Sequence, residues 1–344
     1  MPTPVKAAYF EAHGGPEVMC VGELTSPALR AGDVRIQVKA AALNHLDLFV
    51  RDGWPGLKVP LPHVGGTDLA GTVVEVAADV RSTKVGDEVL VNPGLNFAAG
   101  ADGDLVIPSD VSIVGETRWG GLAQECVVPA THVVAKPKGM SWEEAAAIPL
   151  TSITAMQMVK RKARIKPGDK VLVVGAGGGV AVMALQIAKA QGAWVCATTG
   201  GVDKVAKVKA LGADHVIDYK ASPDWAKEAF VASGKKGFDA IIDSTGAATF
   251  GKSVRLLTLG GRLVTCGATT GGPSDVDVRH IFWKQLSILG STMGVPQDLT
   301  DAIALWEQGK LKVVVDSVWP LDQVKDAMAH LERAGQFGKV IIRP

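Results

Sequence analysis

The apolar positions of the first 140 residues come in short runs that are rich in β-branched residues. Glycine and proline separate these runs at turns such as Gly15-Pro16-Glu17 and Val85-Gly86-Asp87. Runs of this kind between turn residues are typical of β-strands, so we expect an all-β or partly barrel-like region. Its expected strands are residues 5–10, 34–41, 69–76, 88–91 and 123–128.

The pattern changes near Ser141. Ser141 and Glu144 have the spacing of a helix capping box before an alanine-rich helix, which Pro149 should interrupt. From Lys170 onward, apolar runs alternate with amphipathic stretches, which predicts a parallel sheet covered by helices on both faces. The expected strands are residues 171–174, 194–198, 215–218, 239–243, 262–266 and 287–290. The expected helices are residues 180–191, 203–211, 299–308 and 321–333, and a closing strand is expected at 339–342.

The length of 344 residues is too great for one ordinary hydrophobic core, so two domains are expected. The predicted fold class is α/β, with a doubly wound parallel-sheet (Rossmann) domain at residues 151–294. The mostly β domain then comprises residues 1–150 and 295–344.

Charge and composition exclude several classes of partner. The chain has 36 basic and 35 acidic residues, a net charge of +1, so nothing favours a nucleic acid or a membrane surface. The conspicuous uncharged stretch 171–188 contains four glycines and is a poor membrane span. No leader-like segment opens the sequence, so a cytoplasmic protein with a small-molecule substrate is expected. The cysteines are dispersed and are expected to be small buried residues rather than disulfides: Cys20, Cys126, Cys196 and Cys266.

A glycine-rich turn follows the strand 171–174 and precedes a predicted helix. It reads Gly175-Ala176-Gly177-Gly178-Gly179, and this context is that of a dinucleotide-binding turn. Its glycines allow close backbone approach, and the helix N-terminus offers N–H groups to a pyrophosphate. The match to the consensus is imperfect because Ala176 occupies the first glycine position, and glycines used only for packing are the alternative.

The dinucleotide is expected to be NADP(H) rather than NAD(H). An NAD site usually carries an acidic residue at the tip of the second strand, and none stands at Thr199–Gly201. Lys204 and Lys207 follow, and a lysine attracts the 2′-phosphate of NADP(H). Alternatively, these lysines belong to a solvated helix face that Asp203 caps.

Several motifs together resemble those of the medium-chain dehydrogenase/reductases, and the resemblance covers nearly the whole chain. It implies a GroES-like catalytic domain beside the Rossmann domain. The motifs are His13–Val18, Ala41–Asp47, Val50–Gly53, Gly66–Gly71, Gly120–Pro129, Ala210–His215 and Phe337–Val340.

The resemblance also shows what is missing. The positions that match the catalytic zinc ligands of relatives are Asn44, Thr67 and Leu150, and none is a good zinc ligand. Residues Leu95–Gly115 keep the length of the structural-zinc lobe but contain no cysteine, so this lobe should depend on packing. The residues expected to pack it are Leu105, Val106, Ile107 and Trp119.

No metal is therefore expected, which places the chain near the zinc-free, quinone-oxidoreductase-like branch, although the retained lobe is more typical of alcohol dehydrogenases. A non-standard metal site remains an alternative, built from His45, Asp47, His63 and Asp68.

Without zinc, a conjugated acceptor is easier chemistry than a simple alcohol, because hydride addition then gives a delocalised enolate or phenolate. The expected activity is NADPH-dependent hydride transfer to a quinone, enone or other conjugated carbonyl. Asn44 is the expected polar donor, and His45, Thr67 and Asp68 are candidates for orientation or proton supply, with purely structural hydrogen bonds as the alternative. The resemblance implies that Phe49 faces the cofactor cleft and that Thr154 lies beside the nicotinamide. The other expected cofactor-binding residues are Gly175, Gly177, Gly178, Gly179, Val180, Thr199, Gly200, Lys204, Tyr219, Ser244, Thr245, Cys266, Gly267 and Ala268.

Two other functions stay open: an NAD(P)-dependent alcohol dehydrogenase, and a catalytically silent nucleotide-binding protein. The segment Ser287–Thr292 resembles the edge strand that pairs across a two-fold axis in the family. A homodimer, or a tetramer of dimers, is therefore expected.

Overall fold

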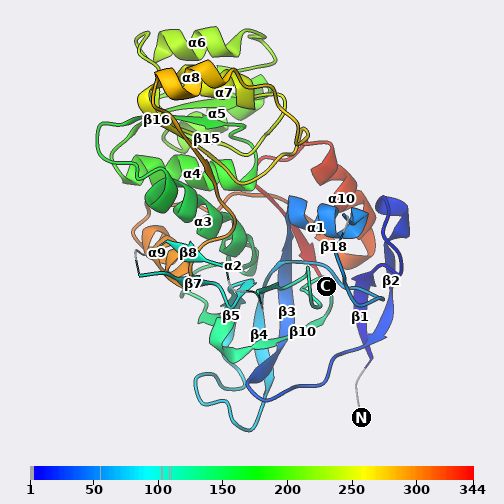
Figure 1. The fold of residues 1–344 in the computed structure, drawn as a ribbon. Coiled ribbons are helices and arrows are strands. Elements are labelled where there is room, and N and C mark those ends of the chain that lie inside the picture. The colour runs from blue at the N-terminus through cyan, green and yellow to red at the C-terminus, as the bar shows by residue number, and fades with distance from the viewer. Residues whose placement is uncertain (1–3, 55, 102–103, 108, 110) are drawn as a thin grey trace. The chain divides into compact units, whose positions relative to one another are not determined.

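The computed structural model describes residues 4–54, 56–101, 104–107, 109 and 111–344. The chain folds into two compact units (Figure 1). The first unit comprises Met1–Ala98, Val106–Leu150 and Val313–Pro344, and the second comprises Ala99–Leu105 and Thr151–Lys312.

The second unit is built on a six-stranded parallel sheet. Its first strand in the chain, β12, lies in the centre, and the strand order is β14-β13-β12-β15-β16-β17. This is the order of a doubly wound dinucleotide-binding sheet, so the predicted fold class is confirmed. The strands are β12 (Lys170–Val174), β13 (Trp194–Thr199), β14 (His215–Asp218), β15 (Phe238–Asp243), β16 (Leu257–Thr265) and β17 (Ser287–Gly290).

Helices cover both faces of this sheet. Figure 1 shows α6, α7 and α8 on one side of β15 and β16, and α4 on the other. The helices are α3 (Pro149–Met156), α4 (Gly179–Ala190), α5 (Val202–Ala210), α6 (Trp225–Ala232), α7 (Phe250–Leu256), α8 (Val278–Trp283) and α9 (Pro296–Glu307), and a π-helical turn, η3 (Gln157–Lys162), continues α3. Among the described residues, no helix has both the length and the apolar character needed to cross a membrane.

The first unit is mostly β, as expected. Its main sheet has the order β11-β5-β4-β3-β19-β18, and β10 also pairs with β3. The strands of this sheet are β3 (Asp33–Leu43), β4 (Asp68–Val76), β5 (Glu88–Val91), β10 (Glu125–Pro129), β11 (Val133–Ala135), β18 (Val315–Pro320) and β19 (Lys339–Arg343). Separate pairs are β1 (Pro4–Tyr9) with β2 (Cys20–Thr25), β6 (Gly94–Leu95) with β9 (Ser112–Ile113), and β7 (Ala98–Ala99) with β8 (Leu105–Val106).

Among the described residues of the first unit, the α-helices are α1 (His45–Asp52), α2 (Trp142–Ala147) and α10 (Val324–Glu332). Its 3-10 turns are η1 (Pro16–Val18), η2 (Ala130–His132) and η4 (Leu321–Gln323). The predicted capping box is confirmed, because Glu144 N donates to Ser141 Oγ at 3.2 Å and Ser141 N donates to Glu144 Oε2 at 3.0 Å. The predicted interruption is confirmed too, since α2 ends at Ala147 and α3 begins at Pro149.

The boundaries of the compact units differ from the expected domain boundaries at residues 295–312 and 99–105. Helix α9 is tied to η3 by Arg161 Nε–Asp298 Oδ1 at 3.0 Å and by Lys160 Nζ–Asp301 Oδ2 at 2.7 Å. Gln186 then holds both backbone groups of Lys312, at 3.0 and 2.8 Å. These contacts keep residues 295–312 within the second unit.

Two packing expectations were wrong. Val106 is 50% exposed and Ile107 is 51% exposed, so they do not pack the lobe at Leu95–Gly115, which includes residues outside the described part. Cys20 is exposed rather than buried, although all four cysteines are free. Trp119 packs against the core of the first unit, which includes Leu95 and Val114 of the lobe, and its indole Nε1 donates to Pro62 O at 3.1 Å.

Candidate active site

The glycine turn joins β12 to α4 and leaves the start of α4 open. Gly175 has a φ of +73°, which suits glycine, and its N–H donates to Thr198 Oγ1 at 3.1 Å. The N-cap residue Gly178 provides no side-chain cap. In the described structure, the N–H groups of residues 179–181 therefore have no side chain capping them. A free helix N-terminus of this kind fits a phosphate group.

The carboxyl ends of the parallel strands meet at the same edge of the sheet, which we call the cofactor edge. Thr199 Oγ1, at the end of β13, is buried without a hydrogen-bond partner among the described residues. Ser291 Oγ, just after β17, is in the same situation, and the sequence did not single it out. Buried hydroxyls without partners are rare in folded proteins, so both point to a missing ligand or water.

The structure gathers most of the predicted cofactor residues at this edge. A Cβ on Gly175 would lie 3.2 Å from Thr245 Oγ1, and a Cβ on Gly267 would lie 3.2 Å from Ser244 O, so the loops after β12, β15 and β16 approach closely. The predicted residues at the cofactor edge are Gly175, Gly177, Gly178, Gly179, Val180, Thr199, Gly200, Lys204, Tyr219, Ser244, Thr245, Cys266, Gly267 and Ala268. Thr154 lies in α3 of the second unit, whereas Phe49 lies on α1 of the first unit and is 44% exposed.

An acidic side chain reaches the tip of β13 from the neighbouring strand. Asp218, the last residue of β14, accepts a hydrogen bond at Oδ1 from Gly201 N at 2.9 Å. This hydrogen bond lowers the pKa of Asp218. Tyr219 covers Gly200 so closely that a Cβ there would lie 2.5 Å from its hydroxyl. Sequence inspection of β13 alone missed Asp218, because strand pairing rather than sequence proximity brings it there.

In the first unit, Asn44 begins α1 and joins a group of buried polar residues. Its backbone N–H donates to Asp47 Oδ2 at 2.7 Å, which is one half of a capping box. Its side-chain Nδ2 donates to Asp68 Oδ2 at 2.9 Å, and its Oδ1 accepts from Lys339 Nζ. We call Asn44, Asp47, Thr67, Asp68 and Lys339 the Asn44 network.

Asp68 and Lys339 form a buried ion pair within this network. Lys339 Nζ lies 3.0 Å from Asp68 Oδ2, and the two residues are 3% and 0% exposed. The other carboxylate oxygen of Asp68 accepts from Leu150 N at 2.9 Å. Lys339 belongs to the motif Phe337–Val340, but the sequence did not single it out as a site residue. Strand register could have found it: Ala42 on β3 pairs with Asp68 on β4 and Ile341 on β19, and continuing this register places Lys339 opposite Asn44.

Asp47 organises the second candidate position, Thr67. Its Oδ1 accepts from Gly66 N and Thr67 N at 3.0 Å and from Thr67 Oγ1 at 3.1 Å. Burial raises the pKa of Asp47, while the hydrogen bonds and Lys339 act in the opposite direction. Asn44, Thr67 and Leu150, the three positions that match zinc ligands of relatives, thus each donate to a buried aspartate.

Neither His45 nor His63 joins a cluster of metal-ligating side chains among the described residues. Burial, and then the charge of Lys339, lower the pKa of His45. His63 is buried beside Gly115 O, at 3.1 Å from Nε2, and burial lowers its pKa. Among the described residues, no group of three or more His, Cys, Asp or Glu side chains is arranged to hold a metal. The alternative site from His45, Asp47, His63 and Asp68 is therefore not assembled.

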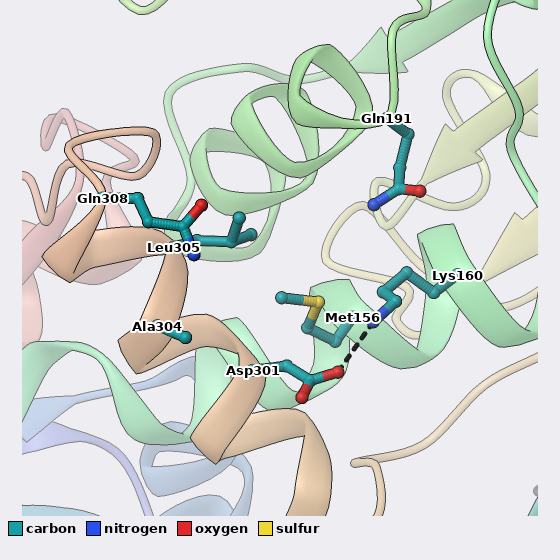
Figure 2. Close-up of a pocket in the computed structure, with 7 residues that line it drawn as sticks. All are labelled: Met156, Lys160, Gln191, Asp301, Ala304, Leu305 and Gln308. Carbon is teal, nitrogen blue, oxygen red and sulfur yellow. Dashed lines mark hydrogen bonds and ion pairs between the residues drawn. The ribbon is translucent and has the colours of Figure 1, made fainter.

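A hollow of about 260 Å³ lies elsewhere in the second unit (Figure 2). It contains the ion pair of Lys160 and Asp301, and Gln191 lines it just beyond the end of α4. The glycine turn is at the other end of this helix of 12 residues, ~18 Å away at 1.5 Å per residue. None of the predicted site residues lines this hollow, so it is separate from the cofactor edge.

Comparison with known proteins finds similarity over most of the chain. Residues 30–138 match the family described as alcohol dehydrogenase GroES-like domain, and residues 179–308 match the zinc-binding dehydrogenase family. A zinc-type alcohol dehydrogenase-like protein of Schizosaccharomyces pombe is 34% identical, over 92% of both chains. The NADPH-dependent alkenal/one oxidoreductase of Arabidopsis thaliana is 31% identical, over 100% of this chain and 81% of its own length. A solved structure of an NAD-dependent alcohol dehydrogenase is 44% identical, with a TM-score of 0.93 over 98% of this chain and 99% of that one.

Proposed function

The chain belongs to the medium-chain dehydrogenase/reductase superfamily and is an NAD(P)H-dependent oxidoreductase; on this premise we propose that it reduces conjugated carbonyls with NADPH, without zinc. The substrate class is a quinone, an enone or another conjugated carbonyl. One observation carries this proposal: Asn44, Thr67 and Leu150 are all committed to hydrogen bonds with Asp47 and Asp68.

The chemistry follows from that arrangement. The nicotinamide supplies the hydride when the cofactor is bound, and the protein supplies position and electrostatics. Hydride addition to a conjugated carbonyl leaves a delocalised anion, which hydrogen-bond donors and fixed charge can stabilise. Thr67 and Asp68 are fully buried and paired with protein groups, which favours an orienting role for them. His45, at the start of α1, is only partly buried and is the better candidate for proton supply.

The cofactor edge fits a dinucleotide, because it offers an uncapped helix N-terminus and the unpartnered hydroxyls of Thr199 and Ser291. NADP(H) is proposed over NAD(H), since no acid stands at Thr199–Gly201 and Lys204 follows. The Arabidopsis relative is itself named as NADPH-dependent. Asp218 acts in the other direction, because an ionised carboxylate near this tip repels a 2′-phosphate.

The second candidate function is NAD-dependent alcohol dehydrogenation. It is favoured by the solved structure at 44% identity, which is named as an NAD-dependent alcohol dehydrogenase, and by the match to the zinc-binding dehydrogenase family. The two functions differ in cofactor, metal content and substrate.

One screen separates the candidates. NADPH and NADH oxidation would be followed with quinones, enones, saturated aldehydes and ketones, and metal content measured on the same sample. We expect turnover of conjugated acceptors with NADPH and no stoichiometric zinc. Preference for saturated carbonyls with NADH and bound zinc would establish the alcohol dehydrogenase instead. Tight NADPH binding without turnover of any acceptor would favour a silent nucleotide-binding protein.

A homodimer, or a tetramer of dimers, is part of the proposal. β17 is the last strand of its sheet, so one edge of its backbone is left for pairing. The neighbouring helix α8 exposes Phe282 (66%) and Trp283 (80%), and exposed aromatic side chains of this kind are typical of interfaces. The proposed location is the cytoplasm, which fits four free cysteines. Light scattering at micromolar concentration would test the assembly, and a monomer would contradict it.

A further inference from the structure

Lys339 is a buried ammonium in the first unit. The residue is 3% exposed, and its Nζ reaches two acceptors, Asn44 Oδ1 and Asp68 Oδ2. A charged side chain is seldom buried to this extent unless it is paired, and here the partner carboxylate of Asp68 is itself 0% exposed. The ammonium therefore contacts directly the side chain at the first position where zinc-dependent relatives carry a ligand.

The pair fixes the orientation of the Asn44 amide. Asn44 Oδ1 faces the ammonium, and Nδ2 faces Asp68 Oδ2 at 2.9 Å. Flipping the amide would place its N–H groups against the ammonium and its oxygen against the carboxylate, so both contacts would become repulsive. Asp68 Oδ1 is held in turn by Leu150 N at 2.9 Å, which fixes the carboxylate as well.

We propose that Lys339 is a positioning residue of the reductase: its buried ammonium fixes Asn44 and supplies the positive charge that relatives obtain from a metal. This rests on the proposed zinc-free function. A fixed charge in a water-poor environment stabilises negative charge on the reacting oxygen more strongly than the same charge in water.

The field of Lys339 extends beyond its hydrogen-bond partners. His45 is the residue after Asn44, and after burial the charge of Lys339 is the second cause that lowers the pKa of His45. His132, also in the first unit, has its pKa lowered by burial and by Arg118 instead. The pKa values of His45 and His132 can thus be compared within one protein, and the comparison requires no catalytic activity.

Four variants test the role: Lys339→Met, Lys339→Arg, the double variant Lys339→Met/Asp68→Asn, and the control Lys6→Met, which removes a lysine from the exposed pair with Asp322. We expect Lys339→Met to lower kcat on the order of 100-fold while leaving KM and the NADPH dissociation constant within about threefold. Lys339→Arg should retain a larger share of kcat because it keeps the charge. Lys6→Met should leave kcat, KM and the NADPH dissociation constant unchanged.

The double variant decides between a role in the reaction and simple neutralisation of Asp68. It removes both charges, so no carboxylate is left buried without a partner, and it should fold even where Lys339→Met does not. Its kcat should stay low. Recovery of the wild-type kcat in the double variant would overturn the proposal, because Lys339 would then serve only to neutralise Asp68.

Nuclear magnetic resonance titration of the histidines gives a readout without substrate. In Lys339→Met, the titration midpoint of His45 should rise while that of His132 stays fixed. An unmoved His45 would overturn the charge role. If the wild-type protein reduces no acceptor, the proposed function fails, and the His45 titration still shows whether the charge of Lys339 acts on its neighbours.

Discussion

The cofactor edge of the second unit and the Asn44 network of the first unit treat their polar groups in opposite ways. At the edge, the start of α4 has no side-chain cap, and the hydroxyls of Thr199 and Ser291 are buried without partners among the described residues. In the network, Asn44 and Asp68 bond to each other, to Lys339 and to the backbone. The polar groups of the cofactor edge are thus left for a ligand to bind, whereas the polar groups of the Asn44 network are satisfied by other groups of the protein.

The largest expected effect is on stability, and it comes from removing one charge of the Asn44 network. Lys339→Met leaves the carboxylate of Asp68 buried without its partner, which should cost about 3–5 kcal/mol in the free energy of unfolding. Urea unfolding would measure it. The double variant Lys339→Met/Asp68→Asn should cost clearly less, and equal costs for the two would show that the ion pair does not organise the network.

The next largest effect is on NADPH affinity, and it comes from placing a carboxylate at the uncapped start of α4. Gly179→Asp places a carboxylate in the first turn of α4, where an acid stabilises the helix but repels a pyrophosphate. We expect NADPH affinity to fall about 100-fold, or ~2.7 kcal/mol, without a loss of melting temperature. Gly179→Asn is the matched neutral control. Unchanged NADPH affinity in Gly179→Asp would mean that the phosphate binds elsewhere.

Charged residues near the tip of β13 should decide the preference between NADPH and NADH. Lys204→Ala should weaken NADPH about fivefold while leaving NADH unchanged, because one charge contact with the 2′-phosphate is worth ~1 kcal/mol. Asp218→Asn should have the reverse effect and tighten NADPH, because it removes a negative charge beside Gly201. Fluorescence titration with both dinucleotides measures this. Equal affinities for NADPH and NADH in the wild-type protein would remove the basis for choosing NADP(H).

A smaller effect is expected from pH, and it belongs to the first unit. Burial lowers the pKa of His45, His63 and His132 below the ordinary value of 6.5. The unfolded chain therefore takes up protons near pH 6.5 that the folded chain does not accept until lower pH. Their stabilising contribution is complete above pH 6.5 and is lost as pH falls toward the folded-state pKa values.

The melting temperature should therefore fall between pH 7.5 and 6. The raised pKa of Asp47 opposes this trend, since a carboxyl that holds its proton in the folded state favours folding at low pH. The variant His132→Gln removes one of these histidines, so its melting temperature should depend less steeply on pH. A steeper profile in His132→Gln would show that the sign is wrong.

The sequence predicted the elements of both units better than it predicted the site. The alternating pattern after Lys170 located every strand of the parallel sheet, because buried strands and amphipathic helices have distinct periods. It missed α1, for which no helix was predicted, although Asp47 lies three residues after Asn44 and accepts a hydrogen bond from the Asn44 N–H.

The contacts that define the site were harder to predict for a physical reason. Asn44 and Lys339 are 295 residues apart, and only the pairing of β19 with β3 brings them together. Asp218 reaches Gly201 through the pairing of β13 with β14. Composition gives the residue types of a site, but strand register decides which of them meet. Apolar character alone did not predict burial either, because Val106 and Ile107 in the lobe are each about half exposed.

The most direct test of the zinc-free account is chelation of the working enzyme. The purified protein would be assayed with NADPH and a conjugated acceptor before and after treatment with a strong chelator, with zinc content and melting temperature measured on the same sample. The Asn44 network predicts sub-stoichiometric zinc, unchanged activity and an unchanged melting temperature. Activity that is lost on chelation and restored by zinc would contradict both the mechanism and the role given to Lys339.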